Sequence, residues 1–275
     1  MKRTHPTKWG KRAGWSARRA ILAIFAHPDD EVAVGPLLSH YAKQRVPVYL
    51  AFVTSGQKGV REHAKIPAGE KLGAVRELEA KAACKVYGIA EPFFLGEQDG
   101  SLSSMLRHDA IVSRLREIIR RVQPAVIITW GPEGLTGHPD HRAVGNLVTE
   151  IFQMWGRNRG YAPAKLYYVA YPKSKFPKPA PPFGGLVGSV DDSYITTIIP
   201  AKDGLPSAVR AQECYKSQHT PEVMKAIYAM LEKVLEGDIC LRLVLPQVRC
   251  PAGAEHDLFV SMEALRQEVN ERSLA

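Results

Sequence analysis

Short apolar runs alternate with amphipathic stretches along the first part of the chain. The continuous apolar runs suit strands that are buried on both faces of a parallel sheet, and they cover 21–26, 47–54, 92–95 and 125–130. In the stretches between them, apolar residues recur every three or four positions, as on the buried face of a helix. The predicted helices cover 32–43, 72–87, 107–121 and 138–155. This alternation predicts an α/β fold: a Rossmann-like, doubly wound and mostly parallel sheet with helices on both faces.

The pattern becomes less regular after residue 156. We expect a strand within 161–171, a Pro/Gly-rich loop over 172–189 and a β-branched strand over 194–200. Further helices are predicted over 205–217 and 221–236, whereas 239–245 fits no element clearly.

The composition is compatible with one domain. A chain of 275 residues with 45% hydrophobic content can bury a substantial core. We expect a single domain over 20–275, with its core in 20–155 and an irregular C-terminal extension over 156–275.

Positive charge is concentrated at the start of the chain. The formal net charge is +9, and residues 1–28 contain seven Lys and Arg but no Asp or Glu. The rest of the chain is therefore nearly neutral, which argues against a folded body that binds nucleic acid. We expect the basic arm, residues 1–19, to be a solvated tail. Binding of this arm to nucleic acid or to an anionic membrane surface is the alternative.

The sequence contains no candidate membrane span and no cysteine framework. No apolar run approaches the roughly 20 residues that a transmembrane helix needs. The first apolar run follows basic residues, as in a signal peptide, but it ends in charged residues instead of a cleavage site, so we expect a cytoplasmic protein. The four cysteines are too widely spaced to indicate disulfides or a thiolate zinc site.

Two polar clusters follow two of the predicted strands. His27, Asp29 and Asp30 come after the run 21–26, and a His-Pro-Asp-His segment from His138 to His141 comes after 125–130. In doubly wound sheets, ligands bind beyond the carboxyl ends of the strands, where both clusters would lie. One such cluster alone is explained equally well as a polar turn that caps a helix. Two together can supply the three histidine and aspartate ligands of a catalytic zinc site.

A dinucleotide-binding module without catalytic activity is a rival interpretation. No G-x-G-x-x-G follows the first predicted strand, and the first cluster would place negative charge where a pyrophosphate needs backbone amides. The sequence therefore favours a metal site over a nucleotide site.

Several motifs along the chain occur in an order that resembles a known family. They are AHPDDE at 26–31, GHPDH at 137–141, T-x-G-x-x-G from Thr54 to Gly59, R-x-x-E at Arg76 and Glu79, and L-G-x-x-D-G-x-L at 95–102. Together they resemble the LmbE-like, or PIG-L, family of zinc-dependent N-deacetylases. The resemblance covers residues 20–155 and continues more weakly through 194–200 and the segment 214–218.

This resemblance implies a role for each residue of the two clusters. His27, Asp30 and His141 match the metal ligands of the family. Asp29 matches the general base, and His138 matches the residue that stabilises the oxyanion or protonates the leaving amine.

Further implied roles concern residues around these clusters. Asp140 matches a residue that orients the histidine corresponding to His138. Arg76 and Asp99 are the candidates to bind sugar hydroxyls.

The function implied is a metal-dependent hydrolase that removes an N-acetyl group from an N-acetylglucosamine-type amino sugar or conjugate. Its cofactor would be one divalent metal, with Zn²⁺ expected and iron(II) the alternative. A related zinc amidase acting on a non-sugar or thiol-conjugate amide is the alternative activity. The expected partner is a small-molecule substrate, and a homo-oligomer is left open.

Some residues depart from the family pattern or are expected to lie outside the site. Gln57, Thr136 and Tyr215 differ from common family residues, which puts the identity of the substrate in doubt more than the catalysis. Glu31 is expected in a first helical turn, where the helix dipole favours it. No site role is expected for five further histidines, which are His40, His63, His108, His219 and His256.

Overall fold

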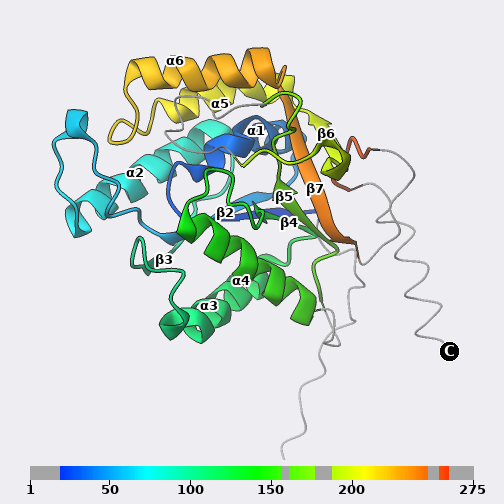
Figure 1. The fold of residues 1–275 in the computed structure, drawn as a ribbon, viewed down its shortest axis with the longest axis horizontal. Helices are drawn as coiled ribbons and strands as arrows, with labels where there is room; N and C mark the ends of the chain where they lie inside the picture. The colour runs from blue at the N-terminus through cyan, green and yellow to red at the C-terminus, as the bar shows by residue number, and fades with distance from the viewer. Residues whose placement is uncertain (1–18, 156–160, 177–187, 247–253, 260–275) are drawn as a thin grey trace, which may run out of the picture.

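The computed structural model describes residues 19–155, 161–176, 188–246 and 254–259. Within them, one seven-stranded sheet has the order β3-β2-β1-β4-β5-β7-β6 (Figure 1). The strands are β1 (Ile21–Phe25), β2 (Val48–Thr54), β3 (Phe93–Glu97), β4 (Val126–Trp130), β5 (Lys165–Val169), β6 (Thr197–Pro200) and β7 (Asp238–Pro246). Strands β1 to β5 are parallel, while β7 runs antiparallel to both β5 and β6.

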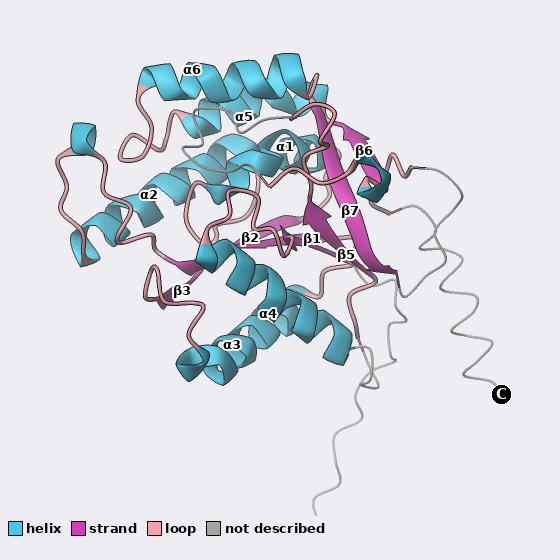
Figure 2. Ribbon diagram, viewed as in Figure 1, coloured by secondary structure: helices cyan, strands magenta, loops and turns pink. Residues whose placement is uncertain are grey.

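Helices cover both faces of the sheet (Figure 2). Helices α1 (Gly35–Lys43), α2 (Glu70–Tyr87), α5 (Leu205–Gln212) and α6 (Pro221–Ala229) lie over one face. Helices α3 (His108–Val122) and α4 (Pro139–Trp155) lie over the other. The predicted α/β fold with a mostly parallel, doubly wound sheet is confirmed.

Strand β1 shows why the apolar runs are continuous. Phe25 belongs to the core beneath α1 and α2, whereas Leu22 and Ile24 belong to the core beneath α3 and α4. Successive side chains of a strand point to opposite faces, so a strand with a helix layer on each side needs apolar residues at every position. All five residues of β1 are buried.

Several predicted helices begin or end at other residues. The helix predicted over 32–43 starts with a 3₁₀ turn (Asp30–Val34), and α1 begins only at Gly35. The helix predicted over 205–217 ends at Gln212, and the one predicted over 221–236 continues after Ala229 as a π-helical turn. The first of these differences matters most, because the 3₁₀ turn contains residues of the first polar cluster.

The C-terminal part is more regular than the sequence pattern predicted. The ambiguous stretch 239–245 forms β7, which enters the sheet between β5 and β6 (Figure 1). A buried ion pair joins Lys165 of β5 to Glu255, with 2.6 Å between Nζ and Oε1. Thus the described C-terminal residues extend the same sheet that carries the N-terminal strands.

Parts of the earlier predictions lie outside the described residues. They include the basic arm up to residue 18 and residues 177–187 of the predicted Pro/Gly-rich loop. Among the helices that the structure describes, none is long and apolar enough to cross a membrane.

Candidate metal centre and active site

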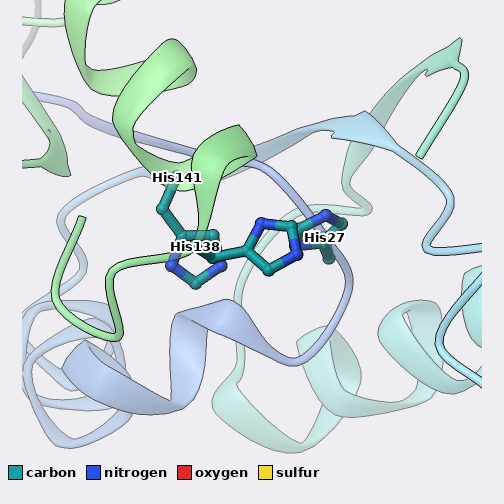
Figure 3. A group of neighbouring side chains, drawn as sticks. All are labelled: His27, His138 and His141. Atoms are coloured by element: carbon teal, nitrogen blue, oxygen red, sulfur yellow. The ribbon is translucent and has the colours of Figure 1, made fainter. Parts of the chain in front are cut away.

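Both polar clusters lie at one edge of the sheet. Strand β1 pairs directly with β4, and each cluster follows the carboxyl end of its strand. His27, His138 and His141 approach one another from the loop after β1 and from the start of α4 (Figure 3). They line one pocket together with Asp29 and Asp30.

The carboxylate of Asp30 lies between two of these histidines. Its Oδ1 is 3.0 Å from Nε2 of His141, and its Oδ2 is 3.6 Å from Nδ1 of His27. Oδ2 also accepts hydrogen bonds from the backbone N–H groups of Ala26, at 3.1 Å, and His27, at 2.9 Å. The backbone at the end of β1 therefore holds this carboxylate between His27 and His141, where all three side chains could bind one metal ion.

His141 is oriented by contacts on its other side. Its ring stacks on Trp130, with 4.8 Å between the ring centroids. Its Nδ1 is 3.0 Å from the carbonyl oxygen of Gly134, to which an Nδ1–H would donate. This tautomer leaves the lone pair of Nε2 facing Asp30, as a metal ligand requires.

His27 is enclosed by carboxylates. Its Nε2 is 3.2 Å from Oδ1 of Asp99 and 3.3 Å from Oδ2 of Asp140, while its Nδ1 faces Asp30. Burial lowers the pKa of His27, but hydrogen bonds to these three carboxylates raise it well above its usual value overall.

The donor set fits a divalent metal. Two imidazoles and one carboxylate, all buried, are the ligand types that zinc takes in catalytic sites. His138 is a competing third ligand, because ring nitrogens of His27, His138 and His141 lie within 4.8 Å of one another. Asp30 is the stronger candidate because it is buried and contacts both His27 and His141, whereas His138 is exposed and its Nδ1 accepts the backbone N–H of Asp140 at 3.1 Å.

Asp29 lines the same pocket, but its contacts are with residues outside this donor set. Its φ of 93° is unusual for a residue other than glycine. Its backbone N–H donates to Oε2 of the buried Glu31 at 3.1 Å. Its side chain pairs with Arg76 at 3.0 Å and lies 3.7 Å from Nε2 of His219. The strained turn therefore directs Asp29 toward Arg76 and His219, while its neighbour Asp30 faces His27 and His141.

Arg76 supports this turn from α2. It is 3% exposed, and its guanidinium donates to the carbonyl oxygens of Pro28 and of Gly56, the latter at 2.8 Å. A Cβ atom at Gly56 or Gly59 would collide with Nη1 of Arg76. The T-x-G-x-x-G and R-x-x-E motifs thus meet in space, and the glycines make room for the arginine.

His138 sits at the N-terminus of α4. Because its Nδ1 accepts a backbone N–H, a proton on the neutral ring lies on Nε2. The partial desolvation of the ring and the neighbouring His27 and His141 lower the pKa of His138. The side chain is therefore a neutral hydrogen-bond donor into the pocket near pH 7.

Asp140 has a different partner from the one expected. Its carboxylate accepts the backbone N–H groups of Gly100, at 2.6 Å, and Leu102, at 3.0 Å, and it contacts His27. Only its backbone bonds to His138. Asp140 is fully buried because α4 points it inward against the loop that follows β3.

Two of the histidines set aside in the sequence analysis line the pocket. His219 is held there because Glu79 accepts hydrogen bonds from the N–H and the hydroxyl of Ser217, at 2.7 and 2.6 Å. His63 lines the pocket from the loop after β2. The signal for His219 was its place directly after the segment 214–218, which resembles the family pattern, but the sequence alone could not show that Glu79 binds Ser217.

Glu31 is also more than a first-turn residue. It is fully buried, and burial together with the charges of Asp29 and Asp30 raises its pKa to about 8. The residues that depart from the family pattern differ in position: Thr136 lines the pocket beside His141, whereas Tyr215 is buried and Gln57 donates to the carbonyl oxygen of Glu97.

Comparison with known sequences agrees with the motifs. The sequence pattern of the family described as GlcNAc-PI de-N-acetylase (PIG-L) matches residues 22–152. A 1D-myo-inositol 2-acetamido-2-deoxy-alpha-D-glucopyranoside deacetylase from Salinispora arenicola is 32% identical over 177 residues, which are 57% of this chain and 57% of that protein. A similarly named deacetylase from Catenulispora acidiphila is 30% identical over 261 residues, which cover 80% of this chain and 85% of the relative.

Solved structures share the fold at lower identity. The N,N'-diacetylchitobiose deacetylase from Pyrococcus horikoshii has a TM-score of 0.64 at 18% identity, covering 84% of this chain and 85% of that one. The 4-carboxy-2-hydroxymuconate hydratase from Pseudomonas putida has a TM-score of 0.65 at 17% identity, covering 86% of this chain and all of that one. Since one fold hosts both reactions, the reaction must be argued from the site.

Proposed function

The chain belongs to the PIG-L family, and on that premise we propose that it is a metal-dependent hydrolase that removes the N-acetyl group of an N-acetylglucosamine-type amino sugar or conjugate. The observation that carries the proposal is that Asp29 lines the same pocket as the donor set of His27, Asp30 and His141. The deacetylases named among its relatives support the substrate class.

His27, Asp30 and His141 would hold the metal, and we propose Zn²⁺ as the ion. When bound, such an ion polarises the amide carbonyl and lowers the pKa of a water. Three protein ligands leave a coordination position open to water and substrate, unlike the closed set of a structural zinc site.

Asp29 would act as the general base. Its carboxylate is free of the metal ligands, and the contact with Arg76 orients it toward the pocket. A general base must reach the proton that it removes, and the turn at Asp29 provides this reach beside Asp30. The proton taken from water would then be passed to the leaving nitrogen.

His138 would stabilise the oxyanion. The neutral ring carries its proton on Nε2, and this N–H can donate to the negative charge that develops on the carbonyl oxygen. The alternative role, protonation of the amine, would require His138 to be charged. The lowered pKa favours the first role.

Arg76 and Asp99 line the pocket and remain the candidates for binding sugar hydroxyls. Both also bond to protein groups: Arg76 to Asp29 and two carbonyl oxygens, and Asp99 to His27 and the N–H of Lys58. Either residue can serve the substrate only with its remaining hydrogen-bonding capacity.

The proposal is tested by acetate release from a panel of N-acetylglucosamine conjugates. We expect release that chelation abolishes and that added Zn²⁺ restores. Full activity after complete metal removal would refute the proposal. A panel that includes N-acyl substrates without a sugar separates an amino-sugar deacetylase from a general amidase.

A further inference from the structure

Within the described part of the chain, His27 is the one candidate metal ligand that has a carboxylate beside each of its two ring nitrogens. Nδ1 lies 3.6 Å from Asp30, on the side of the donor set. Nε2 lies 3.2 Å from Asp99 and 3.3 Å from Asp140, on the opposite side. An imidazole that coordinates a metal through one nitrogen carries a proton on the other, and that proton needs an acceptor.

Asp99 and Asp140 are themselves fixed by backbone groups. The two oxygens of Asp140 accept the N–H groups of Gly100 and Leu102, and Oδ2 of Asp99 accepts the N–H of Lys58 at 2.9 Å. Asp140 is 0% exposed and Asp99 is 5% exposed. Both carboxylates are therefore held rigidly at the same nitrogen of His27.

The same three residues could instead be a second cation site, because His27, Asp99 and Asp140 offer ligand atoms within 4.8 Å of one another. Their hydrogen bonds argue against this. Three of the four carboxylate oxygens already accept backbone N–H groups, and the fourth, Oδ1 of Asp99, faces Nε2 of His27. This geometry suits an N–H donor better than a metal ion.

We propose that Asp99 and Asp140 are positioning residues that jointly accept the Nε2–H of His27 and thereby present its Nδ1 to the metal. The inference rests on the proposed function only in placing a metal at His27, Asp30 and His141. It gives Asp99 a task on the far side of a metal ligand, distinct from the sugar contact expected from the sequence. It also connects the loop after β2 to the metal ligand, since Lys58 belongs to that loop.

Metal affinity tests the proposal. Asp99→Asn and Asp140→Asn keep the size of the side chain but replace a charge-assisted hydrogen bond with a weaker neutral one. We expect the Kd for Zn²⁺, measured by competition with a chromophoric chelator, to rise about 10- to 100-fold in each variant. Glu97→Gln is the matched control: it removes a buried carboxylate near the same loop, but one that pairs with Arg107 and Arg114. Its Kd should stay within about twofold of the wild type.

Steady-state kinetics separate the two roles of Asp99. A residue that only binds sugar hydroxyls would raise KM on substitution while leaving the Kd for Zn²⁺ unchanged, and that result for Asp99→Asn would overturn the proposal. The wild-type chain should bind one equivalent of Zn²⁺. Two equivalents, with one lost in Asp99→Asn, would reveal a second cation site and would also overturn it.

A measurement on the wild type covers the case in which Asp140→Asn fails to fold. Nitrogen NMR of the Zn²⁺-loaded protein, labelled with ¹⁵N-histidine, should show a proton on Nε2 of His27 and a metal-shifted Nδ1. The reverse arrangement would contradict the proposal. If the wild type binds no metal, or releases acetate unaffected by chelation, the proposed function itself fails. If it binds metal but Asp99→Asn binds equally well, only the positioning role fails.

Discussion

The two polar motifs share the letters His-Pro-Asp, yet equivalent positions face different partners. Both histidines line the pocket, but His27 contacts the carboxylates of Asp30, Asp99 and Asp140, whereas Nδ1 of its counterpart His138 accepts the backbone N–H of Asp140. The two aspartates differ as well. The side chain of Asp29 faces the pocket and pairs with Arg76, whereas that of Asp140 is fully buried and contacts Nε2 of His27. The fourth positions, Asp30 and His141, face each other directly, and the rings of His27 and His138 meet edge to face with 4.9 Å between their centroids.

The backbone that follows each proline explains this exchange. After Pro28 the chain enters a left-handed conformation at Asp29 and then a 3₁₀ turn. After His138 it enters the regular helix α4 at Pro139, where proline suits the first position. A local motif therefore specifies which chemical groups arrive at the site, and the turn geometry determines what each group does.

The largest expected effect separates the two aspartates. Asp29→Asn should lower kcat about 10²- to 10⁴-fold, because a neutral amide cannot act as a base, while the Kd for Zn²⁺ stays near the wild-type value. Asp140→Asn should instead weaken metal binding. Measuring kcat and metal affinity on both variants checks the contrast. The proposed difference between the two aspartates would be wrong if both substitutions changed kcat and the Kd for Zn²⁺ in the same way.

A second pair of variants separates the candidate third ligands. Asp30→Asn should weaken Zn²⁺ binding more than about 100-fold, since losing a ligand exceeds the effect of losing a ligand's hydrogen-bond partner. His138→Gln should retain the metal and lower kcat about 10²- to 10³-fold through the lost oxyanion contact. Equilibrium dialysis and steady-state kinetics provide the readouts. Loss of the metal in His138→Gln would assign the third ligand to His138.

A third pair tests the support beneath the first motif. Gly56→Ala should lower kcat/KM more than about tenfold, because the added Cβ would displace Arg76 from Asp29. A small displacement of a catalytic group lowers the reaction rate strongly. Gly69→Ala is the control. Gly69 also has a positive φ, of 129°, but a Cβ there meets nothing within 4 Å. Both variants should lose about 1–3 kcal/mol of unfolding free energy from backbone strain. Equal kcat/KM values for Gly56→Ala and Gly69→Ala would show that Arg76 does not position Asp29 for catalysis.

The smallest expected effect concerns His219, which has no counterpart in the second motif. His219→Gln should lower kcat/KM roughly three- to tenfold, the size of one modest hydrogen-bonding contribution. Burial lowers the pKa of His219 despite the nearby Asp29, so the effect should persist from pH 7 to pH 8, where the ring is neutral. An unchanged kcat/KM would restore the prediction that this histidine has no role.

These contrasts also show what the sequence could and could not predict. The apolar run of β1 and the helical spacing after it reflect local burial, so the parallel sheet and the approach of both motifs to its edge could be predicted. The partner of Asp140 could not be predicted, because His27 lies 113 positions away from it. The direction of the His27 side chain also depends on the turn at Asp29. His219 was missed for a similar reason: its position depends on the contact between Ser217 and Glu79, 138 positions apart.

The position of β7 between β5 and β6 has a consequence for synthesis of the chain. Proteins emerge from the ribosome N-terminus first, so every residue of the candidate centre, up to His219, appears before β7 (Asp238–Pro246). Until then β5 has an open edge, and an open edge is a template for pairing with another chain. A nascent chain that has passed residue 219 but not 246 therefore contains all the candidate site residues while the edge of β5 is still unpaired.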